Sequence, residues 1–574
     1  MKIKDNFYIF ILIIALYYII LQFIFPLFSI NRFNFNIIDI IYVYVYSVIA
    51  YNLSNRNKLI SYIFILVAVF SFFVVEPLCI AIETKPLFFT DIYDMYPALI
   101  EVLPLYMQII TISLTIIYFS LLLGYALYFI IRLYKIFKIN TKRATIMIVL
   151  IIITTYVSFF RPVKIKSIYP DYIKRVNALG IINTIAYRIS YDRAIKVVAN
   201  KENIEASTKL LKEFQDKRDL QKLIMPYGNT DKKREVFIIF MESFYDYEHF
   251  LPLMDKDPFP KEYRQWASNS TKVGPNDNNG SLFARISGLI GASPIFPKKQ
   301  KTPIYTSLPY LMKENGYHTI ALEESGITYY LDTLLPNIGM EYTIFDLGIT
   351  NIKYYIKNYD TDKPVFVYGF TFLGHTGSYI KNDLNVHENN KRFMDKINKK
   401  DIDVFLETIE NSALTAIDIL DTRDIILEKY PNAIIIFKHD HLYPYLKNII
   451  INSSIDSNIK KDFLECQTVM PLLIWNGTNG AFKFEEDGFP PENIPLFIAV
   501  NTKANYTNSL ISLFYKDKID GIIRFYNNFY TNNNGKIEII EVQKESLSYK
   551  INDAQRILQK DILKGKKYFY DIYE

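Results

Sequence analysis

The chain has 574 residues, half of them hydrophobic, with 46 tyrosines and 42 phenylalanines, which excludes an intrinsically disordered protein. Its net charge of +6 is spread along the sequence, without a basic stripe, zinc-finger spacing or RNA-binding signature, so nucleic acid is not an expected partner. The two cysteines, Cys79 and Cys466, lie in an apolar and a polar part of the chain, which argues against a disulfide framework.

The first 161 residues contain five apolar stretches that are typical of membrane-spanning helices. They are Phe7–Phe28, Phe35–Leu53, Leu59–Ile82, Leu105–Ile131 and Ala144–Phe160. Several exceed the roughly 20 residues needed to cross the core of a bilayer, although Asp39 interrupts the second. We therefore predict a transmembrane domain of five helices over residues 1–161.

Lysine and arginine in the short loops predict the orientation of this domain. Basic residues concentrate before the first stretch, between the second and third, and between the fourth and fifth, whereas the other two loops are poor in them. The N-terminus is therefore expected in the cytoplasm, and an odd number of spans places the chain after Phe160 outside. We expect a multi-pass protein of a bacterial-type cell or inner membrane with a large extracytoplasmic domain.

After the apolar region the sequence predicts a connector and an α/β domain. Residues 162–234 are polar with a helical pattern and predict a helical connector. Over residues 235–574, strand-like runs alternate with helical patterns such as Ile402–Tyr430, which predicts an α/β/α domain with a mainly parallel sheet. The predicted strands are Val236–Met241, Thr319–Leu322, Pro364–Thr371, Asn432–Phe437, Met470–Trp475 and Pro495–Val500.

Polar side chains follow three of these strands at their carboxyl ends. VFIIFM runs into Glu242, and VFVYGFTF runs through a leucine and a glycine into His375. AIIIF is followed shortly by Asp440 and His441. Because carboxyl ends of parallel strands meet at one edge of a sheet, one crevice could gather these groups. Two carboxylates and an imidazole would give a divalent ion three ligands and an open position, as in catalytic sites.

Each of these residues also has a simpler interpretation. Glu242 could cap a helix, and His375 could be a hydrogen-bonded loop histidine. His249, His318 and His387 do not follow predicted strands, and we expect them to be surface or structural residues.

Ser281 is the candidate nucleophile that such a metal would activate. In GPNDNNGSLFARISGLIG it follows a turn and opens a helix predicted through Ile290. Backbone amides at a helix N-terminus bind anions, so a phosphoryl group could be held where the serine attacks. The alternative is that Ser281 only caps the helix.

The order of these motifs resembles that of the alkaline phosphatase and sulfatase superfamily. Glu-Ser after an apolar strand, Gly-Ser at a helix start, Gly-His-Thr, Asp-His and MPLLIW follow one another. The preceding apolar stretches narrow the resemblance to a membrane-anchored branch: lipoteichoic acid synthases, phosphoglycerol transferases and phosphoethanolamine transferases. MESFYD followed by DPFP looks most like the lipoteichoic-acid-synthase type, and QKDILKGKKYFYD is similar to a closing motif of that branch.

This resemblance implies roles for residues at matching positions. One divalent ion, Mn²⁺ or Zn²⁺, would be the cofactor. Its ligands would be Glu242, Ser281, Asp440 and His441. Ser281 would also be the catalytic nucleophile, His375 would act on the substrate phosphate, and Arg285 would help to bind substrate.

The sequence departs from the family pattern around the nucleophile. Asn278 and Asn279 replace a glycine pair, serine replaces the usual threonine, and Arg285 stands where relatives often have an acid. No histidine follows His441, so a second metal site is not supported. Phe283 stands where the formylglycine sulfatase motif has proline, which argues against sulfate-ester hydrolysis.

The resemblance implies a sulfatase-like transferase that moves a phosphoglycerol or phosphoethanolamine headgroup through a covalent phospho-serine intermediate. The donor would be a membrane phospholipid, and the acceptor a cell-surface glycan or glycolipid. Two alternatives stay open: a phosphodiesterase or sulfatase-type hydrolase, and a catalytically inactive membrane relative.

Overall fold

The computed structural model describes Ile131, Tyr134 and, with internal gaps, residues 199–573. The gaps are residues 217, 227–231, 274–285, 287, 292–302, 325–330, 346–350, 372, 375–383, 440–443, 467–469, 486, 507–510, 520, 526–527, 534–535 and 565–567. The predicted membrane spans, apart from Ile131, lie outside the described residues. Within the described part of the chain, no helix combines the length and the apolar character that crossing a bilayer requires.

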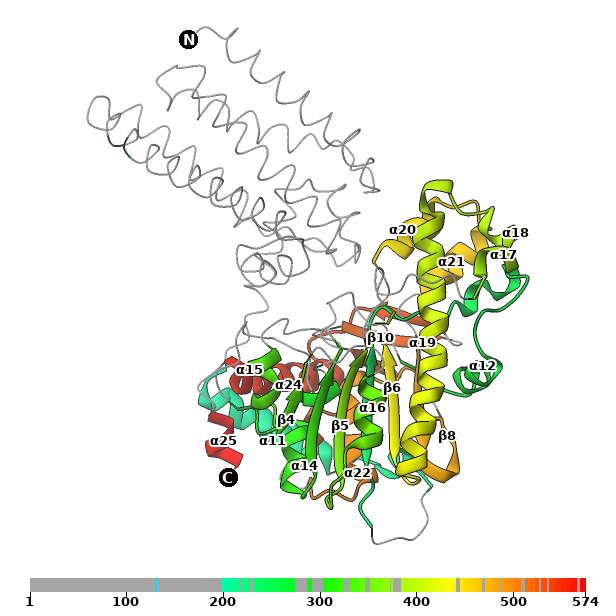
Figure 1. Ribbon diagram of the computed structural model, residues 1–574. Coiled ribbons are helices and arrows are strands. Elements are labelled where there is room, and N and C mark those ends of the chain that lie inside the picture. The colour runs from blue at the N-terminus through cyan, green and yellow to red at the C-terminus, as the bar shows by residue number, and fades with distance from the viewer. Residues whose placement is uncertain are drawn as a thin grey trace, which may run out of the picture. The chain divides into compact units, whose positions relative to one another are not determined.

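The chain divides into two compact units, Met1–Lys196 and Val197–Glu574, and the second is built on an eight-stranded sheet. The described strands follow the order β2-β7-β6-β1-β5-β3-β4, with β8 paired to β7 (Figure 1). The strands β6, β1, β5, β3 and β4 run parallel, whereas β7 is antiparallel to β6 and pairs antiparallel with β2 and β8. The predicted α/β class with a mainly parallel sheet is confirmed, and the sheet is mixed at one edge.

The strands of this sheet are short and mostly buried. Their bounds are β1 Val236–Met241, β2 Thr271–Val273, β3 His318–Glu323, β4 Tyr342–Ile344, β5 Val365–Thr371, β6 Ile434–His439, β7 Met470–Asn476 and β8 Ala481–Phe482. Every residue of β1, β5 and β6 is buried. Continuous apolar runs such as VFIIFM are typical of central parallel strands, because helices cover both faces of the sheet.

One face of the sheet is covered by the long helix α19 (Ile402–Lys429), with α12 (Lys261–Ser268) and α16 (Asn351–Asn358). The alternate residues Phe237 and Ile239 of β1 belong to the hydrophobic cluster on this face. The predicted helix Ile402–Tyr430 is confirmed as α19, which runs along the sheet and extends past it (Figure 1). Shorter elements are η4 Glu248–Leu253, α17 Val386–Asn389, α18 Lys391–Met394, η5 Lys399–Asp401, α20 Pro444–Asn452 and α21 Ser457–Cys466.

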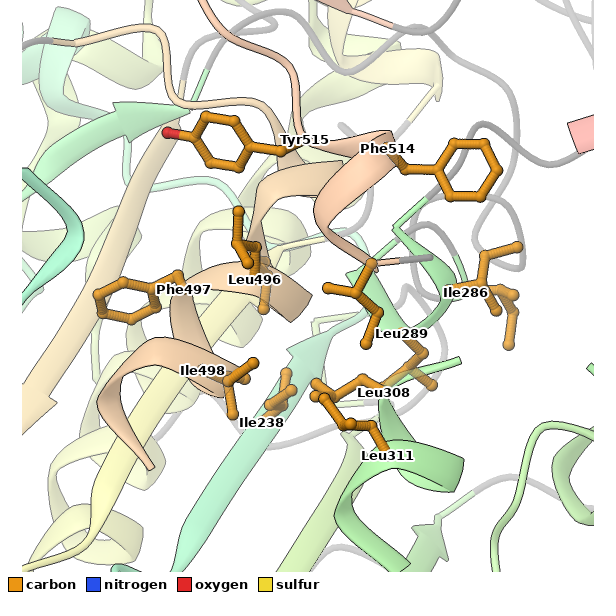
Figure 2. Packing of buried hydrophobic residues seen from close by; sticks show 14 of the residues in the cluster. Ile238, Ile286, Leu289, Leu308, Leu311, Leu496, Phe497, Ile498, Phe514 and Tyr515 are labelled. Carbon is orange, nitrogen blue, oxygen red and sulfur yellow. The ribbon is translucent and has the colours of Figure 1, made fainter. Parts of the chain in front are cut away.

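The other face carries a second hydrophobic cluster, to which Ile238 and Phe240 of β1 contribute. Figure 2 shows side chains of the segment around Leu289, of α14 and of the two helices near Phe497 and Phe514 gathered there. The elements that contribute to this cluster are α11 Lys201–Gln215, η3 Gln221–Leu223, α14 Leu308–Glu314, α15 Leu331–Asn337, α22 Ile494–Asn501, α23 Ile511–Phe514, α24 Leu547–Lys564 and α25 Tyr568–Tyr573. Two short turns are η6 Gly477–Asn479 and η7 Pro491–Asn493.

A smaller antiparallel sheet lies in the C-terminal part of the unit. Its order is β11-β10-β9, with bounds β9 Ile522–Phe525, β10 Asn528–Asn533 and β11 Lys536–Ile540. None of these three strands was predicted from the sequence.

The predicted strand Pro495–Val500 was wrong, because this segment lies in helix α22. Ile494 to Ala499 are all buried, so the run shows no helical periodicity in its hydrophobic pattern. A short apolar run does not distinguish a buried strand from a buried helix. Pro495 in the first turn was the available signal, since proline fits the start of a helix.

Helix α11 lies within the predicted connector, yet it is packed into the second unit. It begins after Asn200, whose side chain accepts a hydrogen bond from the Asn203 amide at 2.8 Å and caps the helix. Ile204 and Leu211 are buried in the same cluster as residues of α24. The predicted domain boundaries themselves stay predictions.

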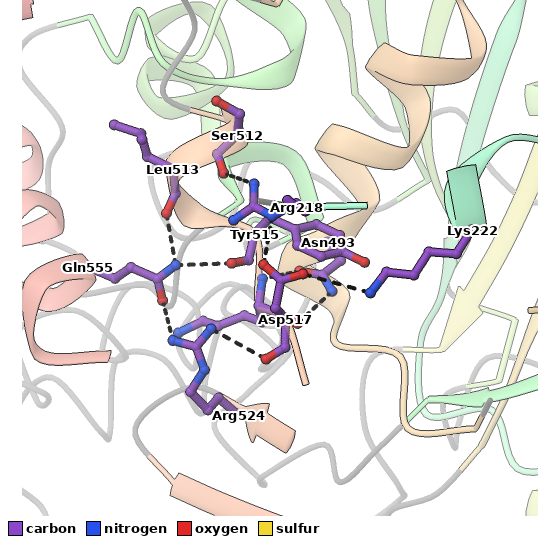
Figure 3. Close-up of polar contacts among 10 residues, drawn as sticks. Arg218, Lys222, Asn493, Ser512, Leu513, Tyr515, Asp517, Arg524 and Gln555 are labelled. Atoms are coloured by element: carbon purple, nitrogen blue, oxygen red, sulfur yellow. Dashed lines mark hydrogen bonds and ion pairs between the residues drawn. The ribbon is translucent and has the colours of Figure 1, made fainter. Parts of the chain in front are cut away.

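A buried polar layer joins this N-terminal segment to the C-terminal elements (Figure 3). The Arg218 guanidinium donates to Asp517 at 2.6 Å and to the Ser512 carbonyl at 2.6 Å. Arg524 donates to the Gln555 side-chain oxygen at 3.1 Å. Next to this layer, burial lowers the pKa of Lys516 to about 8, and its ammonium donates to the Asn552 side chain at 3.3 Å.

Candidate functional site

Three neighbouring parallel strands end at the same level. Met241, the last residue of β1, is in register with Thr371 at the end of β5 and with His439 at the end of β6. The Glu242 amide donates to the Thr371 carbonyl at 3.0 Å, so the ladder continues one residue beyond β1. The chain therefore brings the ends of these three strands, and the described residue Glu242, to one edge of the sheet.

Glu242 is a buried carboxylate at this edge, with 3% of the residue exposed. The Ser243 hydroxyl donates to Glu242 Oε1 at 2.9 Å, and Ser243 is also 3% exposed. Removing a carboxylate from water is costly unless hydrogen bonds or a cation stabilise its charge. Its position suits a group that holds a cation.

Gly374 lies directly against the Glu242 backbone. A Cβ atom at Gly374 would come 2.1 Å from the Glu242 carbonyl oxygen and 3.2 Å from the Phe244 amide nitrogen. Only glycine permits this approach. The loop after β5, which continues into His375, is thus anchored beside Glu242 at Gly374.

Lys438 is a fully buried lysine in β6, in register with Phe240 of β1. Its ammonium lies 5.2 Å from the centre of the Phe240 ring and donates to the His439 carbonyl at 3.2 Å. A cation over an aromatic face is attracted by the ring. A buried positive charge therefore lies on the same face as Phe240, close to the strand ends.

The described helical residues 286 and 288–290 pack on the same face. Ile286, Leu289 and Ile290 are buried in that cluster. A Cβ atom at Gly288 would lie 3.1 Å from Phe240 Cζ, so the segment lies close to β1 near its carboxyl end. This agrees with the predicted helix through Ile290, whose first residues lie outside the described part of the chain.

The turn after Glu242 is held by α19. Ser243 and Tyr247 both have left-handed backbones, with φ of 52° and 55°. The Tyr247 hydroxyl donates to Thr408 at 2.7 Å, and the Tyr245 amide donates to the Ser412 hydroxyl at 3.4 Å. Polar side chains on the buried face of α19 thus fix a turn that no regular strand or helix would supply.

Charged groups surround the far end of this turn. Burial raises the pKa of Asp246, and the charge of Lys272 partly offsets the effect. Burial acts to lower the pKa of Lys272, but Asp246 and Glu248 more than compensate, so its pKa is raised. The Arg264 guanidinium donates to the Asp246 carbonyl at 2.7 Å. These contacts hold the far end of the turn in place.

Of the predicted site residues, the structure describes only Glu242. The others lie outside the described residues, and their assignments stay predictions: Ser281, Arg285, His375, Asp440 and His441. Among the described residues, no three His, Cys, Asp or Glu side chains lie close enough together to hold a metal ion. The available donor fits the expected metal, because a buried carboxylate oxygen suits both Mn²⁺ and Zn²⁺.

Three further residues at this edge have no role predicted from the sequence. They are Ser243 in the Glu-Ser motif, Gly374 directly before His375, and Lys438 directly after the apolar run AIIIF. The signals were a serine directly after a candidate ligand, a glycine directly before a candidate histidine, and a lysine ending a buried strand.

His318 and His387 lie away from the carboxyl ends of the parallel strands. His318 opens β3 at its amino end, and its Nδ1 lies 3.6 Å from a Glu341 oxygen. His387 lies in α17 with an exposed side chain beside Glu388.

No protein-family model matches the sequence, and no curated protein matches it. Among solved structures, the chain is similar to the Streptococcus pyogenes phosphoglycerol transferase GacH in complex with sn-glycerol-1-phosphate. The two share 13% identity and a TM-score of 0.45, over 65% of this chain and 96% of that one.

Two further solved structures are similar. The lipoteichoic acid synthase LtaP from Listeria monocytogenes shares 12% identity and a TM-score of 0.40, over 64% of this chain and 98% of its own. An alkaline phosphatase superfamily protein from Vibrio parahaemolyticus shares 13% identity and a TM-score of 0.38, over 65% and 97%.

Proposed function

We propose that the protein is a metal-dependent transferase of phospholipid headgroups. It would move a phosphoglycerol or phosphoethanolamine group from a membrane phospholipid to a cell-surface glycan or glycolipid. The carrying observation is the buried carboxylate of Glu242 at an edge where three parallel strands end together. The residues that continue from the other two strands include His375, Asp440 and His441.

In this proposal Glu242, Asp440 and His441 hold one divalent ion together with Ser281. The ion would lower the pKa of the serine hydroxyl and neutralise charge that develops on the phosphoryl oxygens. A carboxylate pair with one imidazole leaves room for the hydroxyl and a phosphate oxygen.

The transfer takes two balanced steps. Ser281 Oγ forms a bond to phosphorus while the bond to the diacylglycerol oxygen breaks, and the diacylglycerol leaves as an alcohol. His375 is proposed to hold the phosphate, to take the proton from the Ser281 hydroxyl and to pass it to the leaving oxygen. An acceptor hydroxyl then gives its proton to His375 and forms a bond to the same phosphorus, and Ser281 leaves with that proton.

The anchoring of the domain follows from its substrate. A donor lipid stays in the bilayer, so a catalytic domain tethered to the same membrane meets it at high effective concentration. The five apolar stretches of the first 161 residues are proposed to supply this tether, with the catalytic domain outside the cytoplasm.

The test uses purified full-length protein, Mn²⁺ or Zn²⁺, and phospholipids labelled in the headgroup. We expect release of diacylglycerol and a mass increase on the Ser281 peptide that equals the headgroup phosphate. Ser281→Ala should abolish both, whereas Ser287→Ala, six residues on in the same segment, should not.

A Ser281→Ala protein that still released diacylglycerol would contradict the assignment, as would full turnover after exhaustive chelation. If the label appears only as free headgroup phosphate in the presence of glycan acceptors, the enzyme is a hydrolase instead of a transferase.

A further inference from the structure

We propose that Ser243 is a positioning residue that holds the Glu242 carboxylate in the orientation required to bind the metal. The inference rests on the proposed function, because it takes Glu242 as a metal ligand. Ser243 contacts the proposed metal ligand Glu242, but it is not itself proposed to bind the metal or the substrate.

The contact between these neighbours depends on an unusual backbone. In a strand, successive side chains point to opposite faces, so a serine directly after a glutamate cannot reach its carboxylate. Ser243 has a φ of 52°, in the left-handed region that residues other than glycine seldom adopt. This turn brings the Ser243 hydroxyl to 2.9 Å from Glu242 Oε1.

Two further contacts maintain the turn. Gly374 approaches the Glu242 carbonyl so closely that an added Cβ would lie 2.1 Å from it. On the other side, the Tyr245 amide donates to the Ser412 hydroxyl of α19 at 3.4 Å. The turn therefore lies between the loop after β5 and the long helix, which keeps the disfavoured conformation of Ser243 in place.

The hydroxyl has a defined chemical effect on the carboxylate. Donating to Oε1 fixes the rotation of the carboxylate group and lowers the electron density available on that oxygen. The carboxylate that would hold the metal is thereby kept in one orientation. Groups that hydrogen-bond a metal ligand in this way typically affect metal affinity by about 10- to 100-fold.

The test measures Mn²⁺ binding to the full-length protein by isothermal titration calorimetry, with thermal unfolding of each metal-free variant. Ser243→Ala removes the hydroxyl, and we expect Mn²⁺ to bind about 10- to 100-fold more weakly. Ser243→Gly also removes the hydroxyl but suits the left-handed backbone, so it should bind Mn²⁺ equally weakly while unfolding no earlier than Ser243→Ala.

The matched control is Ser453→Ala, which removes another buried hydroxyl that donates to the Ile450 carbonyl at 2.7 Å. It should leave Mn²⁺ affinity unchanged. Wild-type affinity in Ser243→Gly or Ser243→Ala would overturn the positioning role.

Glu242→Gln separates this inference from the proposed function. If wild type binds Mn²⁺ and Glu242→Gln does not, unchanged affinity in the Ser243 variants overturns the positioning role alone. If wild type and Glu242→Gln bind alike, or neither binds Mn²⁺ or Zn²⁺, the assignment of Glu242 fails and the positioning role fails with it.

Discussion

Two buried groups of opposite charge lie near the strand ends. Glu242 follows β1 with 3% of its surface exposed, and Lys438 lies in β6 with none exposed. Glutamate and lysine are rarely fully buried, because transfer of their ionised side chains from water is costly. Two such residues near the same strand ends favour a functional role for this edge.

A separate buried lysine, Lys516, is expected to make the stability of the protein depend on pH. Burial lowers the pKa of Lys516 from its ordinary 10.5 to about 8. Between these values the unfolded chain holds a proton that the folded chain does not, so stability rises with pH across this window. Below pH 8 both states are charged and folding carries the full penalty, at most about 3 kcal/mol.

We therefore expect Lys516→Met to raise the free energy of unfolding at pH 7 and to lose the gain that wild type shows between pH 8 and 10.5. Urea unfolding at a series of pH values measures this. Lys518→Met, at an exposed lysine two residues on, is the control and should follow wild type. A wild-type curve that is flat across the window, or identical in Lys516→Met, would contradict the prediction.

At the residue scale, part of the candidate site could be predicted from sequence. Glu242 stood out because a carboxylate directly follows a continuous apolar strand. Ser243 did not, because its contact with Glu242 depends on a left-handed backbone, which an ordinary serine gives no reason to expect.

At the scale of elements, the central strands were predictable and α22 was not. VFIIFM and AIIIF are buried on both faces and bounded by polar residues, which is the pattern of central parallel strands. PLFIA is also a continuous apolar run, but in α22 it is buried on all sides of a helix. Where every side chain is buried, hydrophobic periodicity does not distinguish a strand from a helix, and tertiary packing determines which one forms.

The close approach of the β5 loop to β1 gives the next prediction. Gly374→Ala places a Cβ where the Glu242 carbonyl oxygen lies, and backbone atoms cannot yield as a flexible side chain does. We expect destabilisation of about 1–3 kcal/mol and weaker metal binding, because the end of β1 must shift. Thermal unfolding and Mn²⁺ titration measure the two effects.

Gly369→Ala, within β5 itself, is the matched comparison. Its Cβ would meet the Ile239 side chain at 3.3 Å, a neighbour that can adjust. It should lower stability without weakening metal affinity. Equal metal affinity in wild type and Gly374→Ala would contradict the proposed role of this contact.

At the scale of the molecule, the segment before β1 belongs to the folded unit. The polar, amphipathic sequence of residues 162–234 predicted a connector. Nothing in its pattern indicates that the apolar face of α11 packs onto α24. Ile204 and Leu211 are buried at 0% and 2%, and Arg218 forms an ion pair with Asp517. Local sequence patterns cannot predict such contacts, because the residues involved are nearly 300 positions apart in the chain.

Substitution of the buried residue Ile204 tests the packing of α11 in the core. Ile204→Ala should lower the free energy of unfolding by about 2–5 kcal/mol, because it leaves a cavity in the core. Ile224→Ala, at an isoleucine 48% exposed, should change it little. Chemical denaturation of the full-length protein provides the measurement, and equal effects of the two changes would show that α11 does not share the core.

The central claim is that Glu242 binds one divalent ion together with Ser281, Asp440 and His441. Anomalous diffraction from crystals grown with Mn²⁺ tests it most directly, because the signal locates the metal without assuming its ligands. We predict one strong peak at coordination distance, roughly 2.0–2.3 Å, from oxygen or nitrogen atoms of all four residues. A peak elsewhere, or an ordered site in which Glu242 lies out of reach of Asp440 and His441, would contradict the account.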